Sequence, residues 1–130
     1  MPNHEEYVRQ ACIEALKSNM SSKHGCIIRK RNKIISRGHN KLLIKYGQFN
    51  SKTKNIRSVH AEIDALSNTD KRELKNTTLY VVRIKPACDE HKIMTSQLKD
   101  ILCNSEPCKN CSRIINKKFN FCNINILYSH

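Results

Sequence analysis

The stretch Thr78-Leu79-Tyr80-Val81-Val82-Arg83-Ile84 decides the fold of this chain of 130 residues. It is rich in β-branched and aromatic residues and almost continuously apolar, which predicts a strand buried on both faces of a sheet. Its longest strictly apolar run, Leu79 to Val82, is far shorter than the ~20 residues of a membrane span. We therefore expect a globular fold without a membrane partner.

Further elements lie on both sides of this strand. Two short apolar runs, Cys26-Ile27-Ile28 and Ile34-Ile35, flank a polar turn and predict a β-hairpin that ends near Gly38. Apolar residues at helical spacing predict three helices, the first capped by Asn3 and the third opened by Pro107. The predicted elements are, in order, a helix at about 4–19, a hairpin at 26–38, a long basic loop at 40–57, a helix at 60–68, the strand at 78–84, a mixed insertion at 85–106, a helix at 107–118 and a strand at 124–128.

This order of elements predicts an α/β fold. Helices that alternate with the late strands imply parallel pairing through right-handed crossovers, so we expect an antiparallel hairpin followed by parallel strands in one mixed sheet covered by helices. Residues 1–130 are expected to form a single domain. Sheets of this kind bind ligands beside helix N-termini at strand ends, which is where both informative motifs of the chain fall.

Charge is unevenly distributed along the chain. Lys and Arg number 24 against 11 Asp and Glu, a net charge of +13. The 47 residues between Glu14 and Glu62 contain 12 Lys or Arg and no acid. Two interpretations stay open, namely a phosphate-binding surface and compositional drift in a chain dominated by Lys, Ile and Asn.

The cysteine content indicates the cellular compartment. The chain has seven cysteines, and Met1 to Gln10 has no apolar region of a secretory signal. Reduced thiols in the cytoplasm are then expected, where metal binding or catalysis is commoner than disulfides.

Two strings carry the chemistry: His60-Ala61-Glu62 and Pro107-Cys108-Lys109-Asn110-Cys111. Cys108 and Cys111 share one face of a helix's first turn, where the dipole favours the thiolate that zinc binds. His60 from a neighbouring helix supplies a third ligand, and three protein ligands leave the fourth position for the water of a catalytic zinc site. Glu62 can reach that water without binding the metal.

These motifs resemble those of the cytidine and deoxycytidylate deaminase superfamily, which also contains the tRNA adenosine deaminases. The strings Ser58-Val59-His60-Ala61-Glu62 and Glu106-Pro107-Cys108-Lys109-Asn110-Cys111 look like its two zinc signatures, and the hairpin leading to Asn40 looks like its substrate-contacting segment. The resemblance covers most of residues 5–128. It implies a three-layer α-β-α cytidine-deaminase-like fold, here with a long interval between the motifs and a short C-terminus.

The resemblance also implies roles for individual residues. His60, Cys108 and Cys111 would be the ligands of a Zn²⁺ cofactor, Glu62 the catalytic proton shuttle, and Asn40 and Ala61 substrate contacts. The implied reaction is the zinc-dependent hydrolytic deamination of a cytosine nucleotide or nucleoside, in which zinc-bound hydroxide attacks C4. The family tends to form homo-oligomers, and we expect the same here.

Several alternatives remain for the same residues. Cys108 and Cys111 could form a structural zinc site with Cys88, His91 or Cys103, and His39 could line the pocket or lie exposed. Tyr46 and Phe49 could stack on bases or fold back onto the core. Cys12, Cys26 and Cys122 are expected to be core thiols.

Two other functions also fit the sequence. The chain could be a polynucleotide deaminase acting on tRNA, other RNA or single-stranded DNA, with the basic segment following the phosphate backbone. It could also be a zinc-stabilised nucleic-acid-binding module without catalysis, although such a module has no use for the Glu62 carboxylate.

Overall fold

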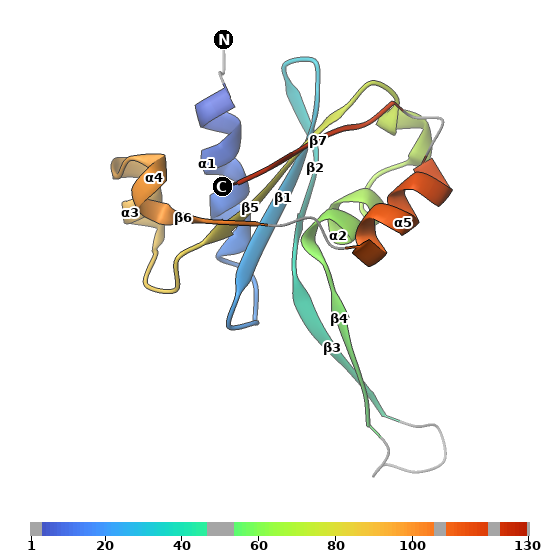
Figure 1. Cartoon of the computed structure of the whole chain (residues 1–130), viewed down its shortest axis with the longest axis horizontal. Coiled ribbons are helices and arrows are strands. Elements are labelled where there is room, and N and C mark those ends of the chain that lie inside the picture. Colours follow the sequence, from blue (N-terminus) through green and yellow to red (C-terminus); the bar gives the residue numbers. More distant parts are fainter. Residues whose placement is uncertain (1–3, 47–53, 106–108, 120–122, 130) are drawn as a thin grey trace.

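The computed structural model describes residues 4–46, 54–105, 109–119 and 123–129 (Figure 1). The side chains of 44–46, 54–57, 110 and 119 are not described. Asn3, Pro107 and Cys122, for which the sequence predicted a helix cap, a helix start and a core thiol, lie outside these ranges. None of the helices in the described ranges is long and apolar enough to cross a membrane.

A five-stranded sheet organises the structure. The hairpin predicted from the sequence is formed by β1 (Lys23–Lys30) and β2 (Lys33–His39), which pair antiparallel. The central strand β5 (Thr78–Ile84) spans the residues predicted for it and also pairs antiparallel with β1. One end of β5 pairs with the short strand β6 (Leu102–Cys103), and the other end pairs with β7 (Asn125–Tyr128).

The sheet is mostly antiparallel, which differs from the predicted run of parallel strands. Within the described residues, β5 and β7 are the one parallel pair. The other neighbours of β5 run against it, because β6 comes from the 85–106 insertion that the sequence left unassigned and β1 from the hairpin.

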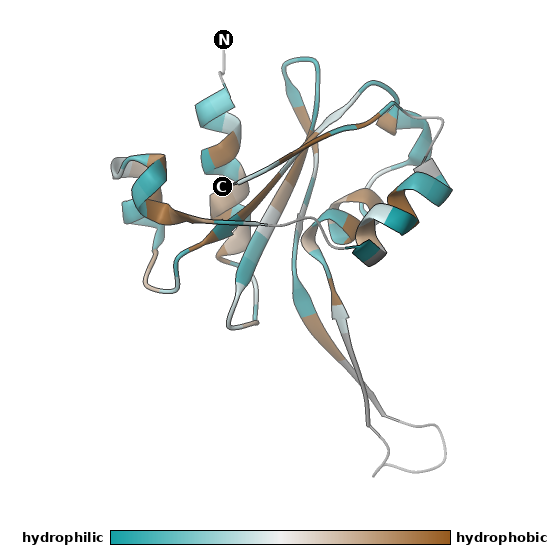
Figure 2. Cartoon of the chain, viewed as in Figure 1, coloured by the Kyte–Doolittle hydropathy of each residue, from teal (hydrophilic) through white to brown (hydrophobic). Residues whose placement is uncertain are grey.

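Helices cover both faces of the sheet and give three layers (Figure 1). Successive side chains of a strand point to opposite faces, so β1 and β5 supply both hydrophobic clusters. On one face α1 (His4–Ala15) packs on the sheet, and on the other lie α2 (Ala61–Ser67) and α5 (Lys109–Phe119). Figure 2 shows hydrophobic residues along the strands and on the helices beside them. The strand residues on the α1 face are Ile27, Tyr80, Val82 and Ile84, and those on the α2 face are Cys26, Ile28, Leu79 and Val81.

Two glycines allow these helices to approach the strands closely. A Cβ added at Gly38 in β2 would lie 2.3 Å from the backbone nitrogen of Ala65 in α2. A Cβ added at Gly25 in β1 would lie 2.0 Å from the carbonyl oxygen of Ala11 in α1. Both separations are far below van der Waals contact, so these positions set how deeply α1 and α2 sit on the sheet.

The first helix ends earlier than predicted, at Ala15 instead of residue 19. The amides of Leu16, Lys17 and Ser18 donate to carbonyls three residues back, which tightens the chain into a turn before β1. Cys12 and Cys26 are fully buried, as expected for core thiols.

The segment predicted as a long loop contains an antiparallel ribbon. β3 (Lys41–Tyr46) pairs with β4 (Lys54–Val59) in a two-stranded sheet that extends from the body of the molecule (Figure 1). The apolar residues 42–44 among the lysines were the signal for a strand. Phe49 lies outside the described residues, and the side chain of Tyr46 is not described.

Two contacts anchor the root of this ribbon. The Lys41 ammonium lies 2.9 Å from the buried Asp64 carboxylate of α2, whose other oxygen accepts a hydrogen bond from the His39 amide. Asn19 hydrogen-bonds both the amide and the carbonyl of Leu42. The position of the ribbon is thus fixed at its root by α2 and by the turn before β1.

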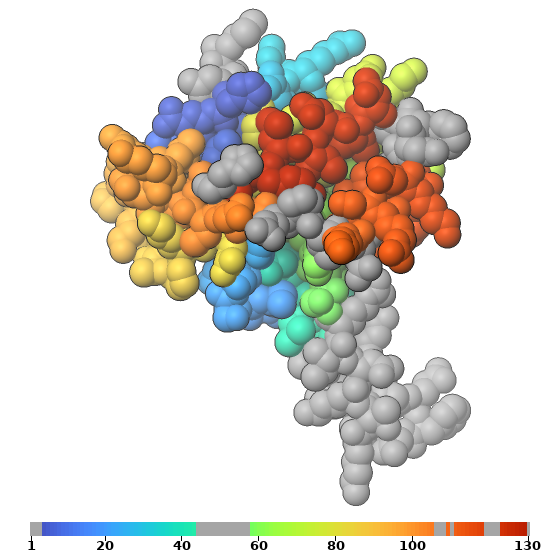
Figure 3. All heavy atoms as spheres, viewed as in Figure 1, coloured from blue at the N-terminus to red at the C-terminus, as the bar shows by residue number. Residues whose placement is uncertain are grey.

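The 85–106 insertion forms α3 (Glu90–Thr95), α4 (Leu98–Ile101) and β6, and a 3₁₀ turn (Lys71–Leu74) precedes β5. Arg9 of α1 donates to the carbonyls of Ile93 and Ser96, which ties the insertion to the first helix. Figure 3 shows this insertion and α5 on either side of β7.

Candidate functional site

The start of α2 presents His60 and Glu62. His60 is the N-cap residue, with an extended backbone at φ −80° and ψ 153°, and its ring makes no capping hydrogen bond. Its carbonyl accepts the first helical bond, from the amide of Asp64. Because Val59 ends β4, the chain passes from strand to helix at His60 with no intervening loop. The backbone position of His60 is therefore fixed by both elements.

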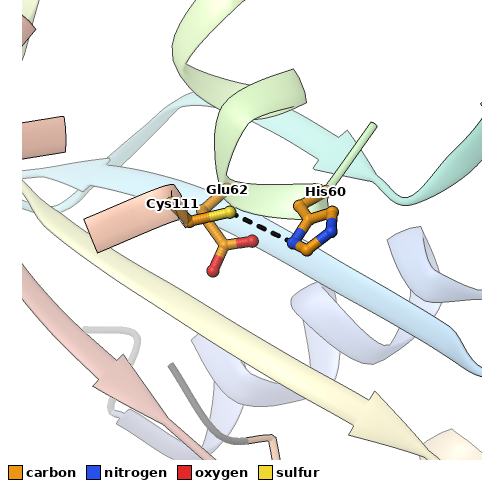
Figure 4. A group of neighbouring side chains, drawn as sticks. All are labelled: His60, Glu62 and Cys111. Atoms are coloured by element: carbon orange, nitrogen blue, oxygen red, sulfur yellow. Dashed lines mark hydrogen bonds between the residues drawn. The ribbon is translucent and has the colours of Figure 1, made fainter. Parts of the chain in front are cut away.

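The first turn of α5 brings Cys111 to the same place. The Cys111 Sγ lies 3.1 Å from the His60 Nδ1 (Figure 4). One ligand atom from each of His60, Glu62 and Cys111 lies within 4.8 Å of the others. Glu62 and Cys111 are buried, with 5% and 3% of their surface exposed. The structure thus joins two motifs that are about fifty residues apart in the chain.

Cys108, the third predicted ligand, lies outside the described residues, three positions before Cys111 in the sequence. None of the alternative partners belongs to the group of His60, Glu62 and Cys111. Cys103 lies in β6, opposite Arg83 of β5. Cys88 packs against the α1-side cluster and His91 is exposed on α3. Among the described residues, His60, Glu62 and Cys111 form the one group of three or more potential metal ligands.

The donor set fits zinc. Zinc binds Cys sulfur at about 2.3 Å and His nitrogen at about 2.0–2.1 Å, so a sulfur and a nitrogen 3.1 Å apart can both contact one ion. Cys111 lies in a helix's first turn, where the dipole and unpaired amides favour a thiolate. A carboxylate beside two such donors is also common in catalytic zinc sites.

A cavity of about 230 Å³ opens beside these donors. It lies where the beginnings of β1 and β3 and the end of β4 meet the start of α2. Asn40 and Ala61, the predicted substrate contacts, both line it. His39 is not among its lining residues, since its ring lies 3.2 Å from the buried Glu14 carboxylate. The full lining is Met20, Ser22, His24, Asn40, Ser58, His60, Ala61, Glu62 and Ser105.

Asn40 holds one wall of the cavity in place. Its side-chain oxygen accepts from the His24 amide at 2.8 Å, and its side-chain nitrogen donates to the Ser22 carbonyl at 2.7 Å. A further bond joins the Asn40 amide to the His24 carbonyl. The Asn40 amide group therefore fixes residues 22–24 against the site as well as facing the cavity.

Two residues near the site were missed from the sequence. His24 lines the cavity, with its Nδ1 3.3 Å from the hydroxyl of the buried Ser105. Burial lowers the pKa of His24, and the nearby Arg83 guanidinium lowers it further, which favours the neutral form of the ring. Nothing in the local sequence distinguished His24 from other histidines.

Tyr128 is the other residue that the sequence did not reveal. Tyr128 is the last residue of β7, and its hydroxyl donates to the Glu62 Oε2 over 3.3 Å. Burial and the Glu62 carboxylate raise the pKa of Tyr128, so the phenol keeps its proton. A tyrosine at the end of a predicted strand gave no signal, because the contact spans 66 residues.

Histidine and cysteine donors at two helix starts lie beside a buried carboxylate and a cavity, an arrangement consistent with a zinc site. Residues 1–121 match the family model of the cytidine and deoxycytidylate deaminase zinc-binding region, and the chain belongs to this family.

Among solved structures, the chain is similar to the dCMP deaminase from the cyanophage S-TIM5 in its apo form. The TM-score is 0.54 and the identity 17%, with 97% of each chain covered. At this identity the likeness concerns the fold, which it supports over nearly the whole chain. No curated protein sequence matches the chain significantly.

Proposed function

We propose that this protein is a zinc-dependent hydrolytic deaminase of a cytosine nucleotide or nucleoside. The observation that carries the proposal is the convergence of His60, Glu62 and Cys111 beside the cavity, in a chain of the deaminase family. In this proposal His60, Cys108 and Cys111 hold the zinc ion.

The reaction replaces the amino group of the base by oxygen and releases ammonia. Zinc supplies a water molecule that ionises near neutral pH. Glu62 takes up one proton of that water and passes it to the ring nitrogen of the base. It then takes the remaining proton from the new C4 hydroxyl group and delivers it to the leaving amine, so that a C4 carbonyl forms and ammonia departs. The burial of Glu62 excludes bulk water that would compete for the proton.

The cavity has room for only a small part of a substrate. At about 230 Å³ it is smaller than the roughly 300–1,000 Å³ pockets of drug-sized ligands, so it suits one base with the rest of the substrate outside. Asn40 and Ala61 would contact the part that enters. The neutral ring of His24 adds a polar group without charge to the wall.

A polynucleotide substrate is the second candidate, because the ribbon begins at the cavity. Asn40 directly precedes β3 and Ser58 belongs to β4, and both line the cavity. The acid-free segment 15–61 includes this ribbon. Some of its cations are paired with acids outside the segment, as in Lys17 with Glu14, Lys30 with Glu73 and Lys41 with Asp64.

The test is ammonia release by purified, zinc-loaded protein from dCMP, CMP, cytidine, adenosine, tRNA and single-stranded DNA. Release from dCMP, CMP or cytidine supports the first candidate. Activity confined to tRNA or DNA, with affinity that falls steeply as salt rises, supports the second. The Glu62→Gln variant should retain zinc and lose nearly all turnover. If the zinc-loaded protein releases no ammonia from any substrate, the interpretation as a non-catalytic binding module is favoured.

A further inference from the structure

Tyr128 contacts the carboxylate on which the proposed reaction depends. We propose that Tyr128 is a positioning residue, whose hydroxyl holds the Glu62 carboxylate in the orientation that proton transfer requires. This inference rests on the proposed function and assigns a role to a residue of the last strand. Its basis is the hydrogen bond from the Tyr128 hydroxyl to the Glu62 Oε2.

The bond restrains an otherwise weakly held group. Within the described residues it is the one hydrogen bond made to the Glu62 side chain. A carboxylate held through one oxygen cannot rotate freely, and Glu62 lines the cavity beside the other donors of the candidate metal site. Because Glu62 is buried, solvent does not replace a lost partner at full strength.

The sheet fixes Tyr128 through the next residue, Ser129. The Ser129 amide donates to the Val81 carbonyl, and its own carbonyl accepts from the Ser105 amide at 2.8 Å. Its hydroxyl donates to the Cys103 carbonyl and accepts from the Arg83 amide. These four bonds tie the end of β7 to β5 and to the segment that leads into the second motif.

Tyr128 is placed on the correct face by the strand alternation. Tyr128 and Ile126 pack with the cluster beneath α2 and α5, whereas Leu127 between them is paired in register with Tyr80 of the α1-side cluster. Tyr128 is paired in register with Val81 of β5, which belongs to the same cluster as Ala61 of α2. The hydroxyl thus reaches Glu62 from a rigid part of the sheet.

The Tyr128→Phe variant distinguishes a positioning role of the hydroxyl from a purely structural role of the ring. Tyr128→Phe keeps the ring and removes the hydroxyl, so packing is retained. If the hydroxyl positions Glu62, kcat should fall about tenfold, while KM and zinc content stay close to wild type. The matched control is Tyr80→Phe, whose hydroxyl bonds His4 on the α1 face of the same sheet, and kcat should not change there.

A second measurement detects the contact without turnover. Thermal unfolding of zinc-loaded wild type, Tyr128→Phe, Glu62→Ala and the double variant forms a double-mutant cycle. Tyr128→Phe should shift the unfolding temperature when Glu62 is present, and the shift should largely vanish in the Glu62→Ala background.

The outcomes separate this inference from the proposed function. An unchanged kcat in Tyr128→Phe, a raised KM alone, or additive shifts in the unfolding cycle would each overturn the positioning role. A wild type that releases no ammonia from any substrate would overturn the proposed function, and the positioning role of Tyr128 with it. An active wild type with a slow Tyr128→Phe variant supports both.

Discussion

The close approach of α2 to Gly38 predicts that one added methyl group displaces the metal site. In Gly38→Ala the new Cβ would meet three backbone atoms of α2, at 2.3 Å from the Ala65 nitrogen, 2.6 Å from the Ala61 carbonyl oxygen and 2.8 Å from the Ala65 Cα. Ordinary contacts lie at about 3.5 Å, so the helix must retreat by about 1 Å. Backbone atoms cannot swing aside as a side chain would.

Two quantities should change together in Gly38→Ala. Overpacking of this kind costs about 1–3 kcal/mol in the free energy of unfolding. Since α2 starts with His60 and Glu62, its retreat also moves a ligand and the proton shuttle, and a 1 Å misplacement can cost about 100-fold in rate. Chemical denaturation measures the first effect. Zinc affinity by competition with a chromophoric chelator and kcat/KM measure the second.

Gly25→Ala is the matched control on the opposite face. There the added Cβ would lie 2.0 Å from the Ala11 carbonyl of α1, which carries no residue of the candidate site. It should destabilise the fold at least as much and leave zinc affinity per folded molecule near that of wild type. Equal loss of zinc affinity in both variants, or a Gly38→Ala protein indistinguishable from wild type, would refute this reasoning.

Three further predictions concern the cavity wall, a core thiol and the metal. Asn40→Ala leaves the half-buried His24 amide and Ser22 carbonyl without their partner. Unfolding should become easier by up to about 1–3 kcal/mol per unsatisfied group, measured by chemical denaturation. The changed shape of the cavity should also raise KM, measured by steady-state kinetics. Burial raises the pKa of Cys12 to about 12, above its ordinary 9.0, so the folded state disfavours the thiolate. Stability is then fully present below pH 9.0 and decreases by up to about 1.4 kcal/mol per pH unit as the pH rises towards 12, and this part of the slope should be missing in Cys12→Ala. Removal of zinc with a chelator should lower the unfolding temperature of wild type much more than that of Cys111→Ser, measured by calorimetry.

Most of the fold was predictable because local patterns and tertiary packing agree. The β5 strand and the α2 helix were predicted within a residue or two, since their apolar residues face the core at the periods expected of a strand and a helix. The ribbon was missed because its apolar residues are surrounded by lysines. The antiparallel pairing of β5 with β6 could not be deduced, because β6 comes from the insertion.

The candidate site divides in the same way. His60, Glu62 and Cys111 were predicted because metal-ligand chemistry restricts residue type and spacing, and the structure brings them together. Tyr128 and His24 were not predicted, because their positions follow from strand register and from contacts across the sheet. Tyrosine and histidine also occur as ordinary core or surface residues, so their type and spacing in the sequence do not reveal such contacts.

The anchored root of the ribbon separates the outer part of the ribbon from the candidate metal site. Lys41 with Asp64 and Asn19 with Leu42 fix the two strands where they leave the cavity, and β4 continues directly into His60. Everything beyond that root can lengthen, shorten or change sequence while the metal donors keep their places. Substitutions in the outer ribbon could therefore change the contacts made outside the cavity without moving the candidate metal donors.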